Sequence, residues 1–359
     1  MKGTYISPLT GTNRTNHLYS QIGVPLFQNK VYDSFEEAIE AKTIDVNLVQ
    51  CLDTGFVFSG DFDIDKLEYD LNYQNEQANS FFFREHLNNV FDLLKEKGLL
   101  HGKILEVGCG KGFFMDMLLK NGFDVVGIDP TYEGDSERVI KDYYSEKYSY
   151  LNADLVILRH TLEHIPRPFE FIKMIAKSNL YKGKIYIEIP TFDWIAKNNS
   201  IEDVFYEHCN YFTPSTISLL FNNCEVQCVF NNQYIGIIAD LAQIKEEIMP
   251  IKDFEQYTLE FEKKLKSYYD KIISLNNIAI WGAGAKGSTF LNLLDKKRDY
   301  IKAVIDINPK KQKKFIGGTG HEIVSPNNLN FFENIVVMNE NYYDEIKKIV
   351  GSKINLITL

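Results

Sequence analysis

The chain has 359 residues and a formal net charge of −10, from 39 Lys and Arg against 49 Asp and Glu. Hydrophobic residues make up 45% and charged residues 25%, which is typical of a soluble globular protein of about two or three domains. The acidic balance argues against a nucleic-acid-binding protein, and we find neither a membrane-length apolar run nor a signal peptide. We therefore expect a cytoplasmic protein without nucleic-acid or membrane partners, and a monomer is compatible with the sequence.

Residues 1–66 predict a small α+β domain. Short β-like segments at Thr4–Ile6, Leu48–Val49 and Phe56–Phe58 are separated by Gly and Pro, with a helix-like stretch at 34–41 between them. Apolar residues then recur at helical spacing over 75–94, which predicts an amphipathic helix.

A second region, 67–243, alternates strands with helices, which favours βα units and a largely parallel sheet. Strands are predicted at Lys103–Val107, Asp124–Ile128, Leu155–Leu158 and Lys184–Ile189, and helices at Gly112–Asn121 and Pro168–Lys177. A charged, helix-rich connector is predicted for 244–276. The C-terminal region, 277–359, predicts another α/β domain, with strands at Ile278–Trp281, Ile301–Asp306, Ile335–Val337 and Ile354–Leu359.

A glycine-rich loop follows the strand at 103–107. Glu106 ends the apolar strand, Gly108, Gly110 and Gly112 follow, and Asp129 ends the next strand. Glycines let the backbone approach a ligand closely, and an acid at the end of the second strand is placed to accept hydrogen bonds from ribose hydroxyls. This combination resembles the cofactor site of class I S-adenosylmethionine-dependent methyltransferases, and we expect these five residues to contact the cofactor.

Two residues that flank the strand at 155–158, Asp154 and His160, are also predicted to contact the cofactor. His160, Glu163 and His164 match the His-Glu-x-x-His type of zinc motif only formally, because that motif needs one continuous helix, whereas His160 ends a strand and Pro166 follows soon after. We expect no metal there.

A second constellation follows the strand that ends near residue 190. Glu207 and His208 are adjacent, with Tyr206 and Tyr211 beside them. Histidine titrates near neutrality and removes protons at cellular pH. We predict His208 as a base with Glu207 as its partner, and the two tyrosines as substrate contacts.

Together these features resemble the sugar C-methyltransferase family, which acts on nucleotide-linked keto-deoxysugars. The resemblance spans nearly the whole chain and includes residues 67–73, the first glycine loop, His164, the Glu207-His208 pair, and the segments 278–287 and 304–320. It implies a class I methyltransferase Rossmann-like domain, a small N-terminal α+β domain and a C-terminal Rossmann-like α/β domain. It further implies that a base forms an enolate that attacks the methyl group of S-adenosylmethionine, and that His164 and Tyr73 line the substrate pocket.

The C-terminal region contains a second glycine loop, in which residues 282–287 fit Gly-x-Gly-x-x-Gly and Asp306 ends the next strand. Alone, this pattern suggests a dinucleotide site and hence an oxidoreductase. The family resemblance instead implies that Gly284, Lys286 and Lys314 help to hold the nucleotide end of a sugar substrate. A solvated lysine-rich loop at 310–314 is the simpler alternative.

Three departures from the family pattern remain. Phe205 stands where a tyrosine is usual, and 231–234 replace a His-Gly-Gly-Ser segment, so O- or N-methylation stays open beside C-methylation. At the N-terminus the family's zinc-ribbon ligands align with Ser7, Thr10, Cys51 and Thr54. One thiolate cannot hold a structural zinc ion, and we expect this degenerate zinc ribbon to fold without metal. An inactive binding subunit is a further alternative, against which the intact Glu207-His208 pair argues.

Overall fold

The computed structural model describes residues 5–70 and 72–359. Its largest sheet has seven strands in the order β11-β12-β9-β8-β5-β6-β7. Strand β12 runs antiparallel to both neighbours, whereas β9, β8, β5, β6 and β7 are parallel. The strands are β5 (Lys103–Val107), β6 (Asp124–Ile128), β7 (Val139–Ile140), β8 (Leu155–Arg159), β9 (Lys184–Pro190), β11 (Glu225–Val229) and β12 (Tyr234–Asp240).

Helices cover both faces of this sheet. Helices α2 (Phe81–Glu96) and α3 (Phe113–Lys120) share one buried cluster with one face of β5 and β8, and α4 (Pro168–Ser178) shares another with the opposite face. This is the predicted class I methyltransferase architecture, a doubly wound Rossmann-like sheet. The helix predicted for 75–94 begins later than expected, because Ser80 is the N-cap and accepts from the Phe83 amide.

The N-terminal region forms a sheet in the order β1-β3-β4-β10, from β1 (Thr15–Pro25), β3 (Thr43–Cys51), β4 (Val57–Ser59) and β10 (Asn210–Tyr211). The short helix α1 (Phe35–Ile39) is capped by Ser34, as the predicted helix there requires. The strand predicted for Thr4–Ile6 is wrong for its described part, because residues 5 and 6 lie outside any strand; residue 4 lies outside the described residues.

The four positions aligned with zinc ligands lie at one place in this region, and we call them the knuckle cluster: Ser7, Thr10, Cys51 and Thr54. Thr10 Oγ1 lies 3.8 Å from Cys51 Sγ. Burial raises the pKa of the Cys51 thiol, but hydrogen bonds from the three hydroxyl side chains and from the Asp53 backbone outweigh burial and lower it overall. Hydrogen bonds between Cys51 and the three hydroxyl side chains are therefore found where the family's zinc ligands align.

The C-terminal region holds a parallel five-stranded sheet in the order β16-β14-β13-β17-β18. Its elements are β13 (Ile278–Trp281), α8 (Ala285–Leu294), β14 (Ile301–Ile305), β16 (Ile323–Val324), β17 (Asn334–Val337), α9 (Tyr343–Val350) and β18 (Asn355–Thr358). The connector is less helical than predicted: only α7 (Phe261–Ile272) forms an α-helix there, and the residues from Pro250 to α7 are irregular. A proline and a charged composition without a complete apolar face explain the difference.

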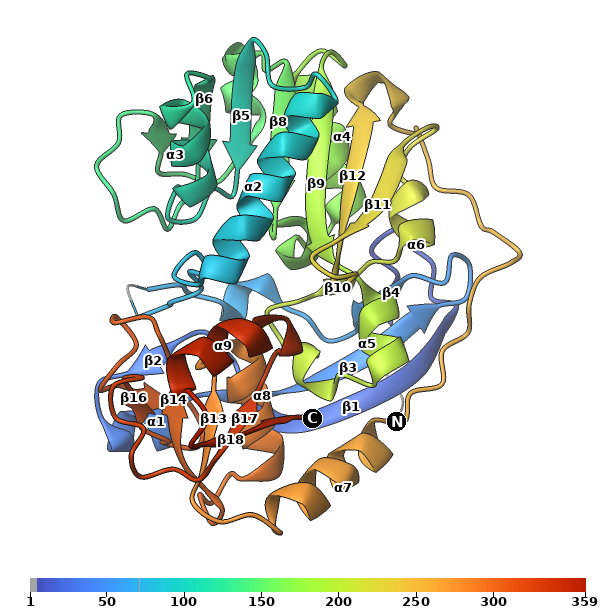
Figure 1. Cartoon of the computed structure of the whole chain (residues 1–359). Coiled ribbons are helices and arrows are strands. Elements are labelled where there is room, and N and C mark those ends of the chain that lie inside the picture. Colours follow the sequence, from blue (N-terminus) through green and yellow to red (C-terminus); the bar gives the residue numbers. More distant parts are fainter. Residues whose placement is uncertain (1–4, 71) are drawn as a thin grey trace.

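The regions are joined by strand pairs. Strand β10 extends the N-terminal sheet, and β2 (Val31–Tyr32) pairs with β15 (Phe315–Ile316) of the C-terminal region. Figure 1 shows the large sheet above, the C-terminal region below it, and the lower end of α2 close to α9. Domain boundaries at 66, 243 and 276 stay a prediction, and both strand pairs cross them.

The remaining helical elements are short: α5 (Phe192–Asn198), α6 (Pro214–Ser218) and the 3₁₀ turns Ile64–Lys66, Glu146–Leu151, Leu162–His164, Ile201–Asp203, Leu241–Gln243 and Glu340–Tyr342. Within 5–70 and 72–359, no helix combines the length and apolar character that crossing a bilayer would require.

Candidate functional site

A cavity of about 560 Å³ lies where the three regions meet. It is lined by the first glycine loop, by the second glycine loop, by Asn29 between β1 and β2, and by Tyr69 and Tyr73 from the segment before α2. Both loops follow the carboxyl ends of parallel strands, where ligands bind in open α/β sheets. The two loops that the sequence singled out therefore face one shared cavity.

The first loop is held open by an aspartate and by left-handed glycines. Gly108 and Gly110 have φ of +76° and +55°, and a Cβ on Gly108 would lie 2.2 Å from Thr161 Oγ1. Asp129 accepts from the Gly110 amide at 2.8 Å and from the Thr131 amide at 2.7 Å. The aspartate thus fixes the loop while its carboxylate borders the cavity.

Glu106 supplies an unused acceptor beside this loop. It is 2% exposed, and its Oε2 has no hydrogen-bond partner in the described part of the chain. Burial raises the pKa of Glu106 to about 8, against the opposing charge of Arg159 and with a further rise from Asp129. An orphaned buried carboxylate next to a glycine cradle fits a ligand rich in hydroxyl and amine donors, such as S-adenosylmethionine.

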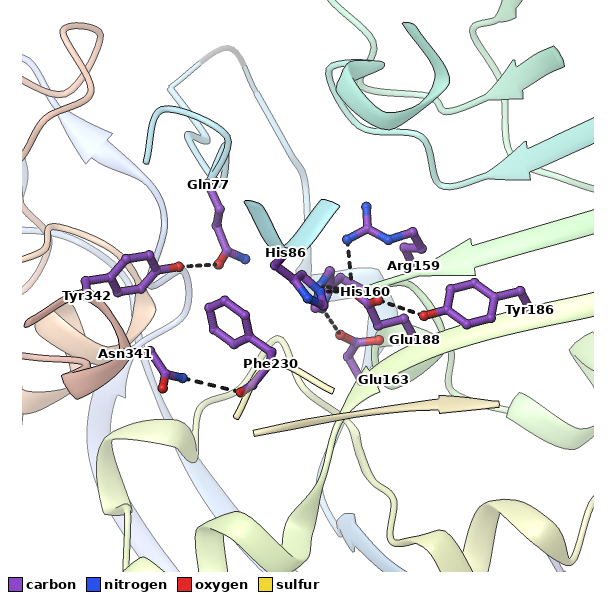
Figure 2. Close-up of polar contacts among 10 residues, drawn as sticks. All are labelled: Gln77, His86, Arg159, His160, Glu163, Tyr186, Glu188, Phe230, Asn341 and Tyr342. Carbon is purple, nitrogen blue, oxygen red and sulfur yellow. Dashed lines mark hydrogen bonds and ion pairs between the residues drawn. The ribbon is translucent and has the colours of Figure 1, made fainter. Parts of the chain in front are cut away.

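Glu188 is a buried carboxylate that contacts two residues of the cavity lining, Arg159 and His160. Figure 2 shows Glu188 bonded to Arg159, His86, His160 and Tyr186. Arg159 Nη2 lies at 2.8 Å, and His86 Nε2 and His160 Nε2 each lie at 3.1 Å, from Glu188 Oε1. Burial raises the pKa of Glu188, but these positive and donor groups hold it well below its usual range.

His160 borders the cavity from the end of β8 with φ of +49°, a left-handed conformation that costs a non-glycine residue energy. Sequence analysis missed Glu188 as a partner of His160. A charged residue inside an otherwise apolar predicted strand was the signal that could have found it.

Two histidines of the cavity lining, His164 and His208, lie next to each other. The rings of His164 and His208 have centroids 4.8 Å apart in an edge-on arrangement. His164 Nδ1 donates to the Glu207 carbonyl at 2.7 Å, so in the neutral ring Nε2 is free to accept a proton. Burial, with His164 and His160 nearby, lowers the pKa of His208 well below its usual value, so His208 is neutral at cellular pH.

Glu207 does not have the predicted arrangement. Its carboxylate is fully buried, accepts from the Gln28 amide at 2.7 Å and lies beside Tyr73. Burial raises the pKa of Glu207, and the Gln28 amide, Tyr73 and His164 oppose that rise. The backbone carbonyl of Glu207 orients His164, whereas its carboxylate points to the N-terminal region rather than to the His208 ring.

Several predicted site residues lie outside the cavity. Asp154 precedes β8, at the opposite end of the sheet, and accepts from the Lys103 amide at 2.9 Å. The Tyr206 hydroxyl exchanges hydrogen bonds with the Asp63 backbone, and the Tyr211 hydroxyl does so with the Phe205 backbone. These three residues do not line the cavity, because a strand end or a ring beside a site does not fix where its polar atom points, and their roles as cofactor or substrate contacts stay predictions.

Two further predicted site residues also lie outside the cavity lining. Gly112 is the N-cap of α3 and lies behind the loop, where a Cβ would meet Tyr132 at 3.2 Å. Lys314 bonds to Asn72 and Asp33 at 2.9 Å each, away from the cavity. Neither residue borders the cavity.

The second loop repeats the construction of the first. Asp306 accepts from the Ala283 amide and the Asn308 amide, each at 2.8 Å. Lys311 donates to the Ala283 carbonyl at 2.9 Å, and burial lowers its pKa. Gly284 and Lys286 border the cavity, with Lys286 paired to Asp203. Of the lysines at 310–314, Lys311 is the one that lines the cavity.

Comparisons with known proteins agree with this geometry. A model of a methyltransferase domain matches residues 75–229, and a model of a C-methyltransferase C-terminal domain matches residues 238–351. The second match includes the second glycine loop.

Individual relatives are distant. The C-methyltransferase NovU of Streptomyces niveus is 22% identical over 282 residues, which is 67% of each chain. A ubiquinone biosynthesis O-methyltransferase of Aliivibrio fischeri is 31% identical over 114 residues, 28% of this chain and 48% of the relative. A solved S-adenosylmethionine-dependent methyltransferase from Archaeoglobus fulgidus aligns with TM-score 0.34 and 19% identity, over 45% of this chain and 99% of that one.

The glycine cradle, the orphaned Glu106 and the two matched models point to the same cofactor. The matches also support a C-methyltransferase family. The chain is an S-adenosylmethionine-dependent methyltransferase with a class I methyltransferase fold.

Proposed function

We propose that the protein transfers a methyl group from S-adenosylmethionine to the carbon next to the ketone of a nucleotide-linked keto-sugar. The observation that supports this most is one shared cavity, whose lining includes the first glycine loop, His164, His208 and the second glycine loop with Lys286 and Lys311. A substrate with a reactive head and an anionic tail fits between them.

Glu106, Gly108, Gly110 and Asp129 would hold the cofactor, and His160 would border it. Bound S-adenosylmethionine supplies an activated methyl group on its sulfonium. The rest of the work is orientation and proton transfer by the chain itself.

His208 would remove the proton. Because its pKa is lowered well below the usual value, it is neutral and able to accept. Tyr73 borders the same space, and burial raises its pKa well above 10, so its hydroxyl keeps its proton and can donate to the developing oxyanion.

The nucleotide end would lie at the second loop. Lys311 and Lys286 border the cavity there, and α8 begins directly after Gly284, so main-chain amides and two cations converge on one place. Such a place favours phosphate groups.

The experiment combines binding and product analysis. Calorimetric titration should show one S-adenosylmethionine site, and labelled cofactor incubated with a panel of nucleotide-linked keto-sugars should give a product with a new carbon–methyl bond. His208→Ala should reduce turnover by about 10²–10⁴-fold with cofactor affinity nearly unchanged, whereas the exposed His101→Ala should leave both unchanged. Equal loss of binding and turnover in His208→Ala would contradict a role as base.

O-Methylation is the second candidate, because Phe205, 4.1 Å from the His208 ring between centroids, brings no hydroxyl to the cavity. A methyl ether instead of a carbon–methyl bond in the product would select it.

A further inference from the structure

Glu163 is a buried carboxylate that the proposed reaction does not yet use. It lies in the 3₁₀ turn after β8, is 2% exposed and borders the cavity. A carboxylate oxygen of Glu163 and ring nitrogens of His164 and His208 all lie within 4.8 Å of one another. Glu163 is thus the acid that adjoins both histidines.

The hydrogen bonds of Glu163 leave part of its carboxylate unused. Oε1 lies 3.8 Å from His160 Nδ1, a contact too long for a strong hydrogen bond, and Oε2 has no partner in the described part of the chain. A buried acceptor without a partner costs about 1–3 kcal/mol. That cost is offset only if the oxygen gains a partner or a neighbouring positive charge during the reaction.

The turn itself is fixed from the other side. The Glu163 carbonyl accepts from the Cys209 amide at 3.0 Å, which ties the turn to the segment that carries His208. The turn and the histidine segment therefore form one unit, and small shifts of either would move both.

We propose that Glu163 is the positioning carboxylate of the His164–His208 pair, the role that the sequence had suggested for Glu207. The inference rests on the proposed function. When the substrate C–H bond breaks, its electron pair enters the enolate and its proton goes to a ring nitrogen of the pair. The Glu163 carboxylate stabilises the imidazolium so formed.

Other titratable groups surround His164 and His208 and influence how readily the two rings become charged. His160 lies on the β8 side, Tyr211 lies 6.3 Å from the His208 ring between centroids, and Tyr73 and the Asp203–Lys286 ion pair border the same cavity. The two neighbouring histidines and burial disfavour a charged His208. A Glu163 carboxylate oxygen lies within 4.8 Å of ring nitrogens of both His164 and His208.

The test replaces Glu163 by Gln and follows the histidine rings directly. Imidazole resonances of His164 and His208 are titrated by NMR in the ligand-free protein, and turnover is measured against pH. We expect the lowest titrating pKa of the pair to fall by about one unit, kcat to fall by about 10-fold or more with KM and cofactor affinity within twofold, and Glu163→Asp to restore part of kcat.

Glu202→Gln is the matched control, because Glu202 is also a buried carboxylate but lies outside this cavity; it should leave the ring titrations unchanged. Unchanged titrations in Glu163→Gln would overturn the proposal. If Glu163→Gln does not fold, judged by circular dichroism, Glu163→Asp decides: an unaltered ring titration and an unaltered pH profile would overturn it. The NMR result needs no substrate, so absence of transfer to every keto-sugar would refute the proposed function alone.

Discussion

The N-terminus of α2 is capped by a residue from the other end of the chain, and this contact yields a sharp prediction. Glu345 in the first turn of α9 accepts from the Ser80 hydroxyl at 2.5 Å and from the Phe81 and Phe82 amides at 3.0 Å each. Those amides are among the donors that a helix leaves without intrahelical partners. The carboxylate therefore caps α2 and ties the C-terminal region to the methyltransferase domain, at the place where the end of α2 lies close to α9 in Figure 1.

Glu345→Ala removes these acceptors. Loss of a cap costs about 0.5–2 kcal/mol, and loss of a negative charge at a helix N-terminus costs about 0.3–1 kcal/mol. Because Ser80 remains as an internal cap, we expect the first turn of α2 to lose about 1.4 kcal/mol of local stability. That loss corresponds to roughly tenfold faster hydrogen exchange at the Phe81 and Phe82 amides.

Asp344→Asn is the control, since Asp344 lies in the same first turn of α9 and is exposed. It changes the charge of α9 equally but leaves the cap of α2 in place. The reasoning is refuted if exchange at the two amides is unchanged in Glu345→Ala, or if Asp344→Asn accelerates it as much.

Three further outcomes are expected. Gly108→Ala should lower the melting temperature and cofactor affinity more than Gly110→Ala, because both have positive φ but only a Cβ on Gly108 collides with Thr161; equal losses would contradict this. Burial raises the pKa of Glu106 to about 8, so the ligand-free fold binds a proton that the unfolded chain releases, and stability falls as pH rises from about 4.5 to 8. Glu106→Gln should raise the unfolding free energy at pH 8 by about 1–2 kcal/mol and flatten that slope in denaturant titrations at several pH values. Metal analysis should find no stoichiometric zinc in the purified protein, and replacing the three hydroxyl residues of the knuckle cluster by Cys should create zinc binding.

The sequence located strands well where both faces of a sheet are buried. Strands β5 and β6 have the predicted bounds, and β8 and β9 are each one residue longer, because continuous apolar runs bounded by turns leave little choice. It missed the mostly buried β12, and it missed β1 and β11, whose side chains are largely partly exposed or exposed. Polar residues in β1 and β11 hide the alternation that marks a half-buried strand.

The sequence also found which segments meet at the cavity, since strand order places carboxyl ends together, but it did not indicate that Glu163 adjoins the two histidine rings. Glu207 and His208 are neighbours in the chain, yet their side chains leave the backbone in different directions. Glu163, 45 residues before His208, points toward it. Adjacency in sequence fixes proximity of backbones and not of polar atoms.

One departure from the family pattern has a structural counterpart. Residues 230–232 all have positive φ, and this turn between β11 and β12 meets the segment before α9. Asn231 donates to Asn341 at 3.0 Å, while Asn339 and Asn341 donate to Gln233 at 3.0 and 2.9 Å. Figure 2 shows Asn341 also reaching the Phe230 carbonyl. Side-chain amides of the turn and of the segment before α9 thus hydrogen-bond to one another. These bonds and the Glu345 cap join the two regions whose glycine loops line one cavity. Because the two loops belong to separate sheets, this docking brings them to one cavity, and Gln233 and Tyr234 at the end of the turn line that cavity themselves.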